Sequence, residues 1–196
     1  MFRNDVAAGR NKLSTGKIRK PVAGAGRAGA TAALKLARRG RRVLIVEKER
    51  FPRFHIGESL LPYNMPLFDE LGLRPLLDSA GFVVKRAAQF RSGSGSPGAR
   101  LKFANGTYTQ HPTAFQVERA TFDHLLLQQA EKAGADVWQE TTFSKGAGGG
   151  DSVRVSLRPP GEAVTHHQAR FLLAASGMTA ATARQNGDRL PRQGHR

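Results

Sequence analysis

The chain has 196 residues, a formal net charge of +16, 39% hydrophobic residues and no cysteine. The missing cysteine excludes disulfide bonds, thiolate metal sites and cysteine nucleophiles, and no apolar run reaches the ~18 residues of a membrane span. We expect a globular chain, because its apolar share is close to that of globular proteins once its 22 glycines are included. No apolar h-region follows the positive charge of Met1 to Lys12, so we expect no secretory signal and take the cytoplasm as the default location.

Basic residues lie in three separate places: the first twenty residues, the cluster from Lys35 to Arg42, and the tail after Arg184. Nucleic-acid modules gather such charges into one stripe and interleave them with aromatic side chains, a pattern that this sequence lacks. We therefore expect a solvated basic surface and no specific nucleic-acid partner. An acidic partner segment is an alternative that the charge leaves open.

The first predicted elements are a helix and a strand. The helix is indicated by apolar residues at three- and four-residue steps, namely Ala30, Ala33, Leu34 and Ala37. We expect it to end at Gly40. The branched run from Val43 to Val46 predicts a parallel strand buried on both faces. A strand ahead of the helix has little support, because KIRKP contains one branched residue and a proline, and only Val22 and Ala23 fit.

The middle of the chain changes from a helical to a β pattern. Helices are predicted from about Leu60 to Leu71, with Ser59 as the N-cap, and from Pro75 to Ala80. Beyond Gly81, apolar alternation and the hairpin dipeptide Asn105-Gly106 predict an antiparallel sheet inserted near residues 82 to 113.

The last third returns to a helix and then to short strands. The helix is predicted from Glu118 to Ala133, and its apolar face consists of Phe122, Leu125, Leu126 and Ala130. ARFLLAASG predicts a last buried strand that stops at Gly177. This order of elements predicts an α/β, Rossmann-like fold. The chain divides into five segments: a basic N-terminal segment at 1–17, the first part of a nucleotide-binding domain at 18–81, an inserted β segment of a substrate domain at 82–113, the continuation of the nucleotide-binding domain at 114–177, and an irregular tail at 178–196.

A glycine fingerprint lies at the start of the first predicted helix. Gly24, Gly26 and Gly29 have the Gly-x-Gly-x-x-Gly spacing of dinucleotide sites. There the first glycine allows a tight turn, the second lets the backbone approach a pyrophosphate, and the third lets helix and strand pack closely. Glu47 closes the next strand, where a carboxylate can bind a ribose. The alternative is a glycine-rich helix start followed by a surface glutamate.

The stretch FPRFHIGESLLPYNMPLFDELGL, from Phe51 to Leu73, resembles the flavin-dependent halogenase and geranylgeranyl-reductase-like group of FAD-dependent oxidoreductases. The resemblance runs from about Val22 to Gly177 and is most specific at GAGRAG, GESLLP, FQVERATFDHLLL and FLLAASG. It implies the N-terminal portion of such a protein, truncated where relatives continue into a second flavin-contacting motif.

The resemblance implies FAD as the cofactor. The residues that would hold its ADP half are Gly24, Gly26, Ala28, Gly29 and Glu47. Arg119 would reach the flavin nucleotide, and the IGES segment would pass near the isoalloxazine ring through Gly57, Glu58 and Ser59. Two alternatives stay open: Arg119 as a surface helix residue paired with Asp123, and Ser59 as an ordinary helix cap.

Lys85 is the candidate catalytic residue by the same resemblance. It lies where halogenase-like relatives carry a lysine that handles hypohalous acid, although Ala87 replaces a family glycine and Ala174 replaces a family aspartate. The alternative is a solvated strand lysine. His166 and His167 are adjacent in a predicted strand and would point to opposite faces, so we expect no metal site.

The most favoured function is the N-terminal FAD-binding part of a halogenase- or monooxygenase-like oxidoreductase that acts on a small-molecule substrate. A separate flavin reductase is a candidate partner. The alternatives are a geranylgeranyl-reductase-like enzyme for isoprenoid double bonds and a non-catalytic nucleotide-binding remnant. We also expect the isolated chain to be marginally folded and catalytically silent, because losing part of a core can consume the small stability of a domain.

Overall fold

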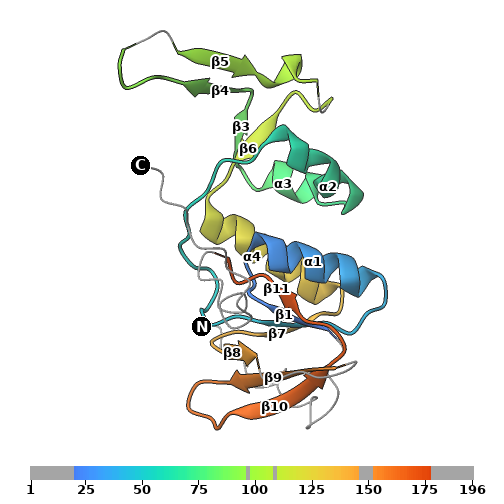
Figure 1. Ribbon diagram of the computed structural model, residues 1–196. Helices are drawn as coiled ribbons and strands as arrows, with labels where there is room; N and C mark the ends of the chain where they lie inside the picture. The colour runs from blue at the N-terminus through green and yellow to red at the C-terminus, as the bar shows by residue number, and fades with distance from the viewer. Residues whose placement is uncertain (1–19, 96–97, 108–109, 146–151, 178–196) are drawn as a thin grey trace, which may run out of the picture. The chain divides into compact units, whose positions relative to one another are not determined.

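The computed structural model describes residues 20–95, 98–107, 110–145 and 152–177 (Figure 1). The segments expected at 1–17 and 178–196 therefore lie outside the described residues. Within the described ranges the chain forms two compact units, the first from 20–53 and 123–177 and the second from 54–122. Every helix in this part of the chain is too short or too polar to cross a membrane.

The first unit contains a four-stranded parallel sheet of order β11-β1-β2-β7. Its strands are β1 (Pro21–Ala23), β2 (Leu44–Val46), β7 (Asp136–Trp138) and β11 (Leu173–Ala174). The three residues of β2 are all buried, as its branched, apolar sequence predicts. This arrangement confirms the expected α/β class.

The short first strand, β1, is an inner strand of this sheet. It pairs with β11 on one side and with β2 on the other, and its three residues are buried. Pro21 is its first residue, a place where a proline is tolerated because the ladder of hydrogen bonds only begins there. The strand is therefore only as long as the apolar residues after KIRK allow.

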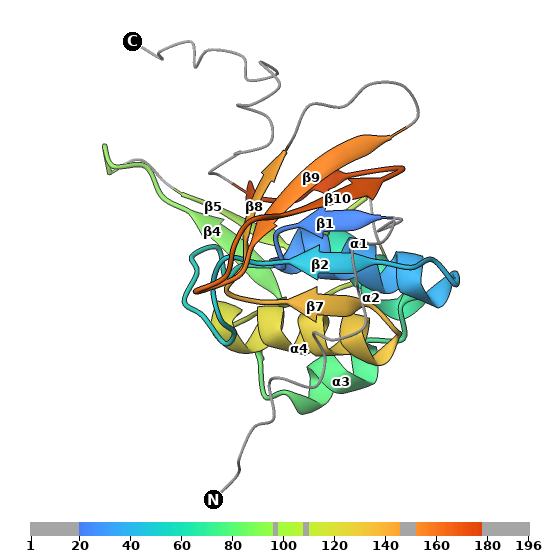
Figure 2. The ribbon, with the colours of Figure 1, turned by 90° about the horizontal axis from the view of Figure 1, so that it is seen from below.

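The sheet of the first unit lies between helices and a second sheet (Figures 1 and 2). One face carries α1 (Arg27–Arg38) and α4 (Arg119–Lys132), of which the residues from Asp123 onward belong to this unit. The other face carries the antiparallel sheet of β8 (Thr142–Lys145), β9 (Val153–Arg158) and β10 (Thr165–Ala169). The two sheets share a core of Leu44, Val46 and Leu157, against which Trp138 and Phe143 pack.

The second unit is built from short elements. It contains η2 (Pro62–Asn64), α2 (Met65–Glu70), α3 (Arg74–Ser79) and η3 (Phe103–Asn105). Among its described residues the strands form two separate antiparallel pairs, one of β3 (Val83–Lys85) with β6 (Ala114–Gln116) and one of β4 (Ala87–Phe90) with β5 (Ala99–Lys102).

Two local predictions in the second unit are wrong. Ser59 does not cap a helix, because it forms an isolated bridge with Gln116 and the α-helix begins only at Met65. Asn105-Gly106 does not form a hairpin turn, since Asn105 ends η3 and Gly106 has an extended conformation. At Ser59, backbone pairing with the distant Gln116 overrides the local preference for capping. At Asn105-Gly106, the end of a 3-10 turn replaces the hairpin turn. Part of the strand expected after Gly106 lies outside the described residues.

Two predictions in the first unit need smaller corrections. On α4 the buried leucines are Leu126 and Leu127, while Leu125 is only half-buried. The last strand, β11, has two residues instead of a long buried run, and Ala174 is exposed. It is shorter because β11 is an edge strand that pairs only along the two residues facing Val22 and Ala23.

Candidate functional site

The first glycine of the fingerprint makes the turn between β1 and α1. Gly24 has a φ of +102°, in the region that favours glycine. A Cβ added there would lie 2.5 Å from the carbonyl oxygen of Ala175. The turn is fixed on both sides, since Gly24 N–H donates to Val46 at 2.8 Å and Ala175 N–H donates to Ala23 at 2.8 Å. These contacts explain why the tight turn predicted at this position requires a glycine.

The third glycine allows the helix to pack on the turn. A Cβ added at Gly29 would lie only 1.9 Å from the carbonyl oxygen of Gly24. That overlap with backbone cannot be relieved by a rotamer change. Gly29 is thus required by the fold itself.

The second glycine lies in a more open environment. A Cβ added at Gly26 would come no closer than 3.4 Å to the Nη2 atom of Arg53, the far end of a flexible side chain. Gly26 is the N-cap of α1, no side chain caps this helix end, and no acidic residue lies in the first turn. Helix N-termini of this kind hydrogen-bond phosphate groups and favour negative charge. Ala28, in the same turn, is exposed.

Glu47 is buried, not a surface residue. It is 5% exposed at the end of β2, and its two carboxylate oxygens accept backbone hydrogen bonds from Ala25 at 2.8 Å and from Glu49 at 3.0 Å. A carboxylate has about four acceptor positions, so these two bonds leave acceptor capacity for a hydroxyl. Glu47 therefore links the fingerprint turn to the loop after β2.

Arg53 and Asp123 are two residues of this site that the sequence reasoning missed. The Arg53 side chain is 12% exposed, and its ion pairs join Nε to Glu49 at 3.1 Å and Nη1 to Asp123 at 3.7 Å. Neither nitrogen makes a hydrogen bond among the described residues. Asp123 is fully buried. The signal in the sequence was the arginine of FPRF, which follows Glu47 in the loop after β2.

Arg119 is buried within the second unit. It is 4% exposed, and its Nη1 atom donates to the Ile56 carbonyl at 2.6 Å and lies 3.2 Å from Nδ1 of His55. The planar guanidinium suits such several-pronged contacts. Arg119 therefore holds the start of the IGES segment and is not a surface helix residue.

The IGES segment is otherwise exposed. Gly57, Glu58 and Ser59 are all accessible, and Gly57 has a φ of +94°. The segment is held at its far end by Glu58, whose carbonyl accepts from Val117 N–H at 2.9 Å. An accessible loop with fixed ends is a suitable surface for a bound ring.

Lys85 contacts the end of the same segment. Its Nζ atom donates to Ser59 Oγ and, at 3.0 Å, to the carbonyl of Leu60. The ammonium also lies 5.5 Å from the centroid of the Phe103 ring, within the range of a cation–π interaction. Lys85 is half-buried and is positioned by these contacts, unlike a freely solvated strand lysine.

The predicted residues thus form two groups, one in each unit. Gly24, Gly26, Gly29 and Glu47 come together in the first unit around the turn after β1. Lys85, Arg119 and the IGES segment come together in the second unit.

His166 and His167 lie on opposite faces of β10, as expected from strand geometry. His166 is exposed and His167 is 5% exposed. Burial lowers the pKa of His167 below its ordinary value, and the neighbouring His166 lowers it further. Within the described ranges, no group of three His, Asp or Glu side chains could hold a metal ion.

Comparison with known sequences gives the family. The family described as FAD binding domain matches residues 20–196. The chain belongs to this FAD binding domain family. The match begins at the first described residue and includes the fingerprint, Glu47, the IGES segment and Lys85.

Relatives of this FAD binding domain include halogenases. The chain is 38% identical over 167 residues to a tryptophan 2-halogenase from Chondromyces crocatus, a match that covers 84% of this chain and 31% of the relative. It is 35% identical over 132 residues to the flavin-dependent halogenase armH4 from Armillaria mellea, covering 60% of this chain and 23% of the relative. The FAD binding domain thus spans less than a third of the length of these relatives.

Solved structures give the same result. The myxobacterial chondrochloren halogenase CndH has a TM-score of 0.76 and 36% identity, covering 83% of this chain and 38% of that one. A flavoprotein/dehydrogenase from Cytophaga hutchinsonii has a TM-score of 0.83 and 32% identity, covering 91% of this chain and 44% of that one. The chain is therefore a halogenase-like FAD-binding portion, and these relatives favour it over the geranylgeranyl-reductase-like alternative.

The residues of the first unit fit FAD, the cofactor of the family. The space beside Gly26 admits a pyrophosphate backbone contact, and the Nη2 atom of the Arg53 guanidinium borders that space. Glu47 has the acceptor capacity that a ribose needs.

Proposed function

We propose that this chain supplies the FAD-binding part of a flavin-dependent halogenase, with Lys85 as the residue that contacts the oxidised halogen. The single observation that carries the proposal is the attachment of Lys85 Nζ to Ser59 and Leu60, at the end of the IGES segment. The relatives' printed names, which include a tryptophan 2-halogenase and flavin-dependent halogenases, support the same reaction class.

Lys85 has the chemistry that the proposed role requires. An ammonium has three N–H donors and no acceptor. Ser59 and Leu60 accept two of these bonds, which leaves the third donor for the oxygen of a hypohalous acid. A hydrogen bond there draws electron density away from the halogen and makes it a better electrophile toward an electron-rich substrate. Bound FAD in its reduced form would supply, with molecular oxygen, the oxidation of halide.

The residues that would bind FAD fall into two groups. We propose that Gly24, Gly26, Ala28, Gly29 and Glu47 hold its ADP half. In the second unit, Arg119 fixes Ile56 and so sets the course of Gly57, Glu58 and Ser59, the segment assigned to the isoalloxazine ring. The substrate is a small molecule, and a separate flavin reductase is the proposed source of reduced flavin. Silence of the isolated chain and a cytoplasmic location stay predictions.

The test is a chimera, because the chain spans 31% of the tryptophan 2-halogenase. Residues 20–177 replace the matching part of that enzyme, and halide-dependent turnover is measured with reduced FAD and oxygen. We expect Lys85→Met to reduce turnover at least a hundredfold while the dissociation constant for FAD stays within twofold. Lys102→Met, at an exposed position of β5, is the matched control and should keep full turnover.

Two results would contradict the proposal. One is a chimera that binds FAD and carries Lys85 but shows no turnover dependent on chloride or bromide. The other is equal turnover in the Lys85→Met and Lys102→Met variants.

A further inference from the structure

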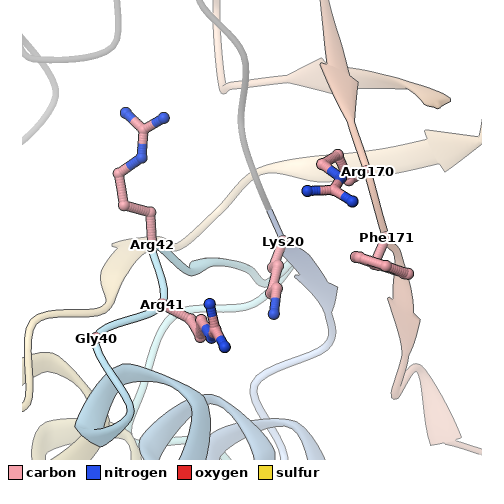
Figure 3. A pocket seen from close by; sticks show the side chains of 6 residues that line it. All are labelled: Lys20, Gly40, Arg41, Arg42, Arg170 and Phe171. Carbon is pink, nitrogen blue, oxygen red and sulfur yellow. The ribbon is translucent and has the colours of Figure 1, made fainter. Parts of the chain in front are cut away.

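A basic cavity lies at the amino-terminal edge of the parallel sheet in the first unit. Lys20 precedes β1, Arg41 and Arg42 precede β2, and Arg170 and Phe171 precede β11. Because these three strands are parallel neighbours, their amino ends bring the five residues together. With Gly40 they line a cavity of about 260 Å³ (Figure 3).

This cavity is separate from the cofactor site. The fingerprint lies at the carboxyl ends of the same strands, and Lys20 and Gly24 are separated by the length of β1. At about 3.3 Å per residue in a strand, the two sites are roughly 10 Å or more apart. None of the residues assigned to FAD lines the cavity.

The backbone around the cavity is fixed. Gly40 ends α1 with a φ of +67°, and its N–H donates to Ala37 at 2.8 Å while that of Arg41 donates to Leu36 at 3.1 Å. This is the hydrogen-bond pattern of a helix C-terminal cap. Lys20 is held next to β2, because its carbonyl accepts from Leu44 N–H at 3.3 Å. The cations are therefore carried by ordered backbone.

Two of the cations share one aromatic ring. Lys20 Nζ lies 5.6 Å from the centroid of Phe171, and Arg170 Cζ lies 5.7 Å from it. The side chains of Lys20 and Arg41 are directed toward the space between them and Phe171, whereas that of Arg42 extends away (Figure 3). Phe171 is 54% exposed, so part of its ring is accessible to a ligand.

The positive charge of the cavity is not neutralised by the described part of the chain. Among the described residues, no carboxylate lies within ion-pair distance of any of the four cations. Asp136 begins the neighbouring β7 but does not line the cavity. The end of α1 contributes only about half a negative charge. Lys20, Arg41 and Arg170 therefore bring three positive charges to one space, which favours binding of an anion.

We propose that this cavity binds a small phosphorylated molecule with a flat ring, its phosphate between Lys20, Arg41 and Arg170 and its ring against Phe171. Guanidinium groups bind phosphate and carboxylate oxygens alike through paired N–H donors, but three cations around one space match the charge of a phosphate, up to two negative, better than that of a single carboxylate. The volume is below the roughly 300 to 1,000 Å³ of sites for drug-sized ligands, which limits the ligand to a small one. The site is independent of the halogenase proposal.

Calorimetric titration of the full chain with phenyl phosphate tests the proposal, at low salt and with saturating FAD so that the fingerprint is occupied. The cavity variant is Lys20→Gln/Arg41→Gln/Arg170→Gln. The matched control, Arg91→Gln/Arg100→Gln/Lys102→Gln, removes the same three charges from exposed positions of the second unit. We expect the cavity variant to bind at least tenfold more weakly and the control to bind within twofold of wild type.

A second variant tests the ring and guards against misfolding. Phe171→Leu keeps every charge and should bind inorganic phosphate as wild type does, while losing the preference for phenyl phosphate. The proposal is overturned if wild type does not bind phenyl phosphate at millimolar concentration, or if both triple variants weaken equally. It is also overturned if FAD displaces phenyl phosphate, because the fingerprint would then be its site.

Discussion

Glu47 and Ala25 are joined by a hydrogen bond of 2.8 Å, from the backbone N–H in the fingerprint turn to the buried carboxylate at the end of β2. The other carboxylate oxygen accepts from Glu49 N–H at 3.0 Å. Glu47 is thus part of the fold before any ribose is bound, and its replacement acts on stability as well as on binding.

Replacing Glu47 with Gln should therefore have two effects. The amide has one oxygen, so its NH₂ group must face one of two N–H donors, which costs about 1 to 3 kcal/mol of the free energy of unfolding. The dissociation constant for FAD should rise at least tenfold. Urea unfolding measures the first effect and fluorescence quenching the second. Glu131→Gln, at an exposed position of α4, is the control, and equal unfolding free energies in the two variants would refute the structural role.

The fingerprint glycines should separate into a folding glycine and a binding glycine. Gly29→Ala should abolish the cooperative thermal melt, because its methyl group would overlap the Gly24 carbonyl oxygen at 1.9 Å. Gly26→Ala should melt near wild type, since its methyl group meets only Arg53 Nη2 at 3.4 Å. It should nevertheless weaken FAD binding, because the methyl group occupies the path of the pyrophosphate. A Gly26→Ala variant that binds FAD like wild type would refute this assignment.

Arg53 should contribute to FAD binding beyond its ion pair with buried Asp123. We expect Arg53→Met to lower both the melting temperature and the affinity for FAD, the latter about tenfold or more. Adding Asp123→Asn removes the buried charge and should restore the melting temperature but not the affinity. Arg50→Met, an exposed position in the same loop, is the control. Recovery of both properties in the double variant would show that Arg53 only neutralises Asp123.

His167 should make the first unit less stable in acid. Its pKa is lowered by burial and, to a smaller extent, by His166, so the unfolded chain takes up this proton at a higher pH than the folded chain. The stabilisation that neutral His167 provides is complete above the pKa of this histidine in the unfolded chain. It is lost as the pH falls toward its lower pKa in the folded chain. Melts between pH 7.5 and 5.5 should show a smaller loss for His167→Gln than for wild type, and His166→Gln should fall between the two because it removes only the lesser cause of the lowered pKa.

The single tryptophan offers a local readout of this proton. The rings of Trp138 and His167 are edge-on at 6.0 Å between centroids, so a charged imidazole should change the emission of Trp138. Another group causes the acid sensitivity if Trp138 emission does not follow pH in wild type and the melting temperatures of both histidine variants fall with pH as much as that of wild type.

Elements with a strong period or a continuous apolar run could be predicted from the sequence. Helix α1 has its apolar face at Ala30, Ala33, Leu34 and Ala37, all of which are buried, and β2 follows from its branched residues. The first strand has little support in the sequence, yet the two residues that fit a strand, Val22 and Ala23, make up nearly its whole length. In these places local preference and burial agree.

Other features depend on residues far away in the chain and have no local signal. Ser59 looks like a helix cap, but its backbone pairs with Gln116 and its hydroxyl accepts from Lys85. The contact between Arg53 and Asp123 joins a loop to a helix some seventy positions later. Motif spacing identified the glycines and Glu47, but it could not show which groups hold them in place.

The turn at Gly24 is completed by a segment made much later during synthesis. Ala175, whose N–H donates to Ala23, follows the fingerprint by about 150 residues, which take roughly 8 to 30 s to translate at about 5 to 20 residues per second. During that interval β1 lacks its β11 neighbour and has one open edge. On the ribosome, the nucleotide-binding motif is therefore synthesised well before the segment that completes its shape.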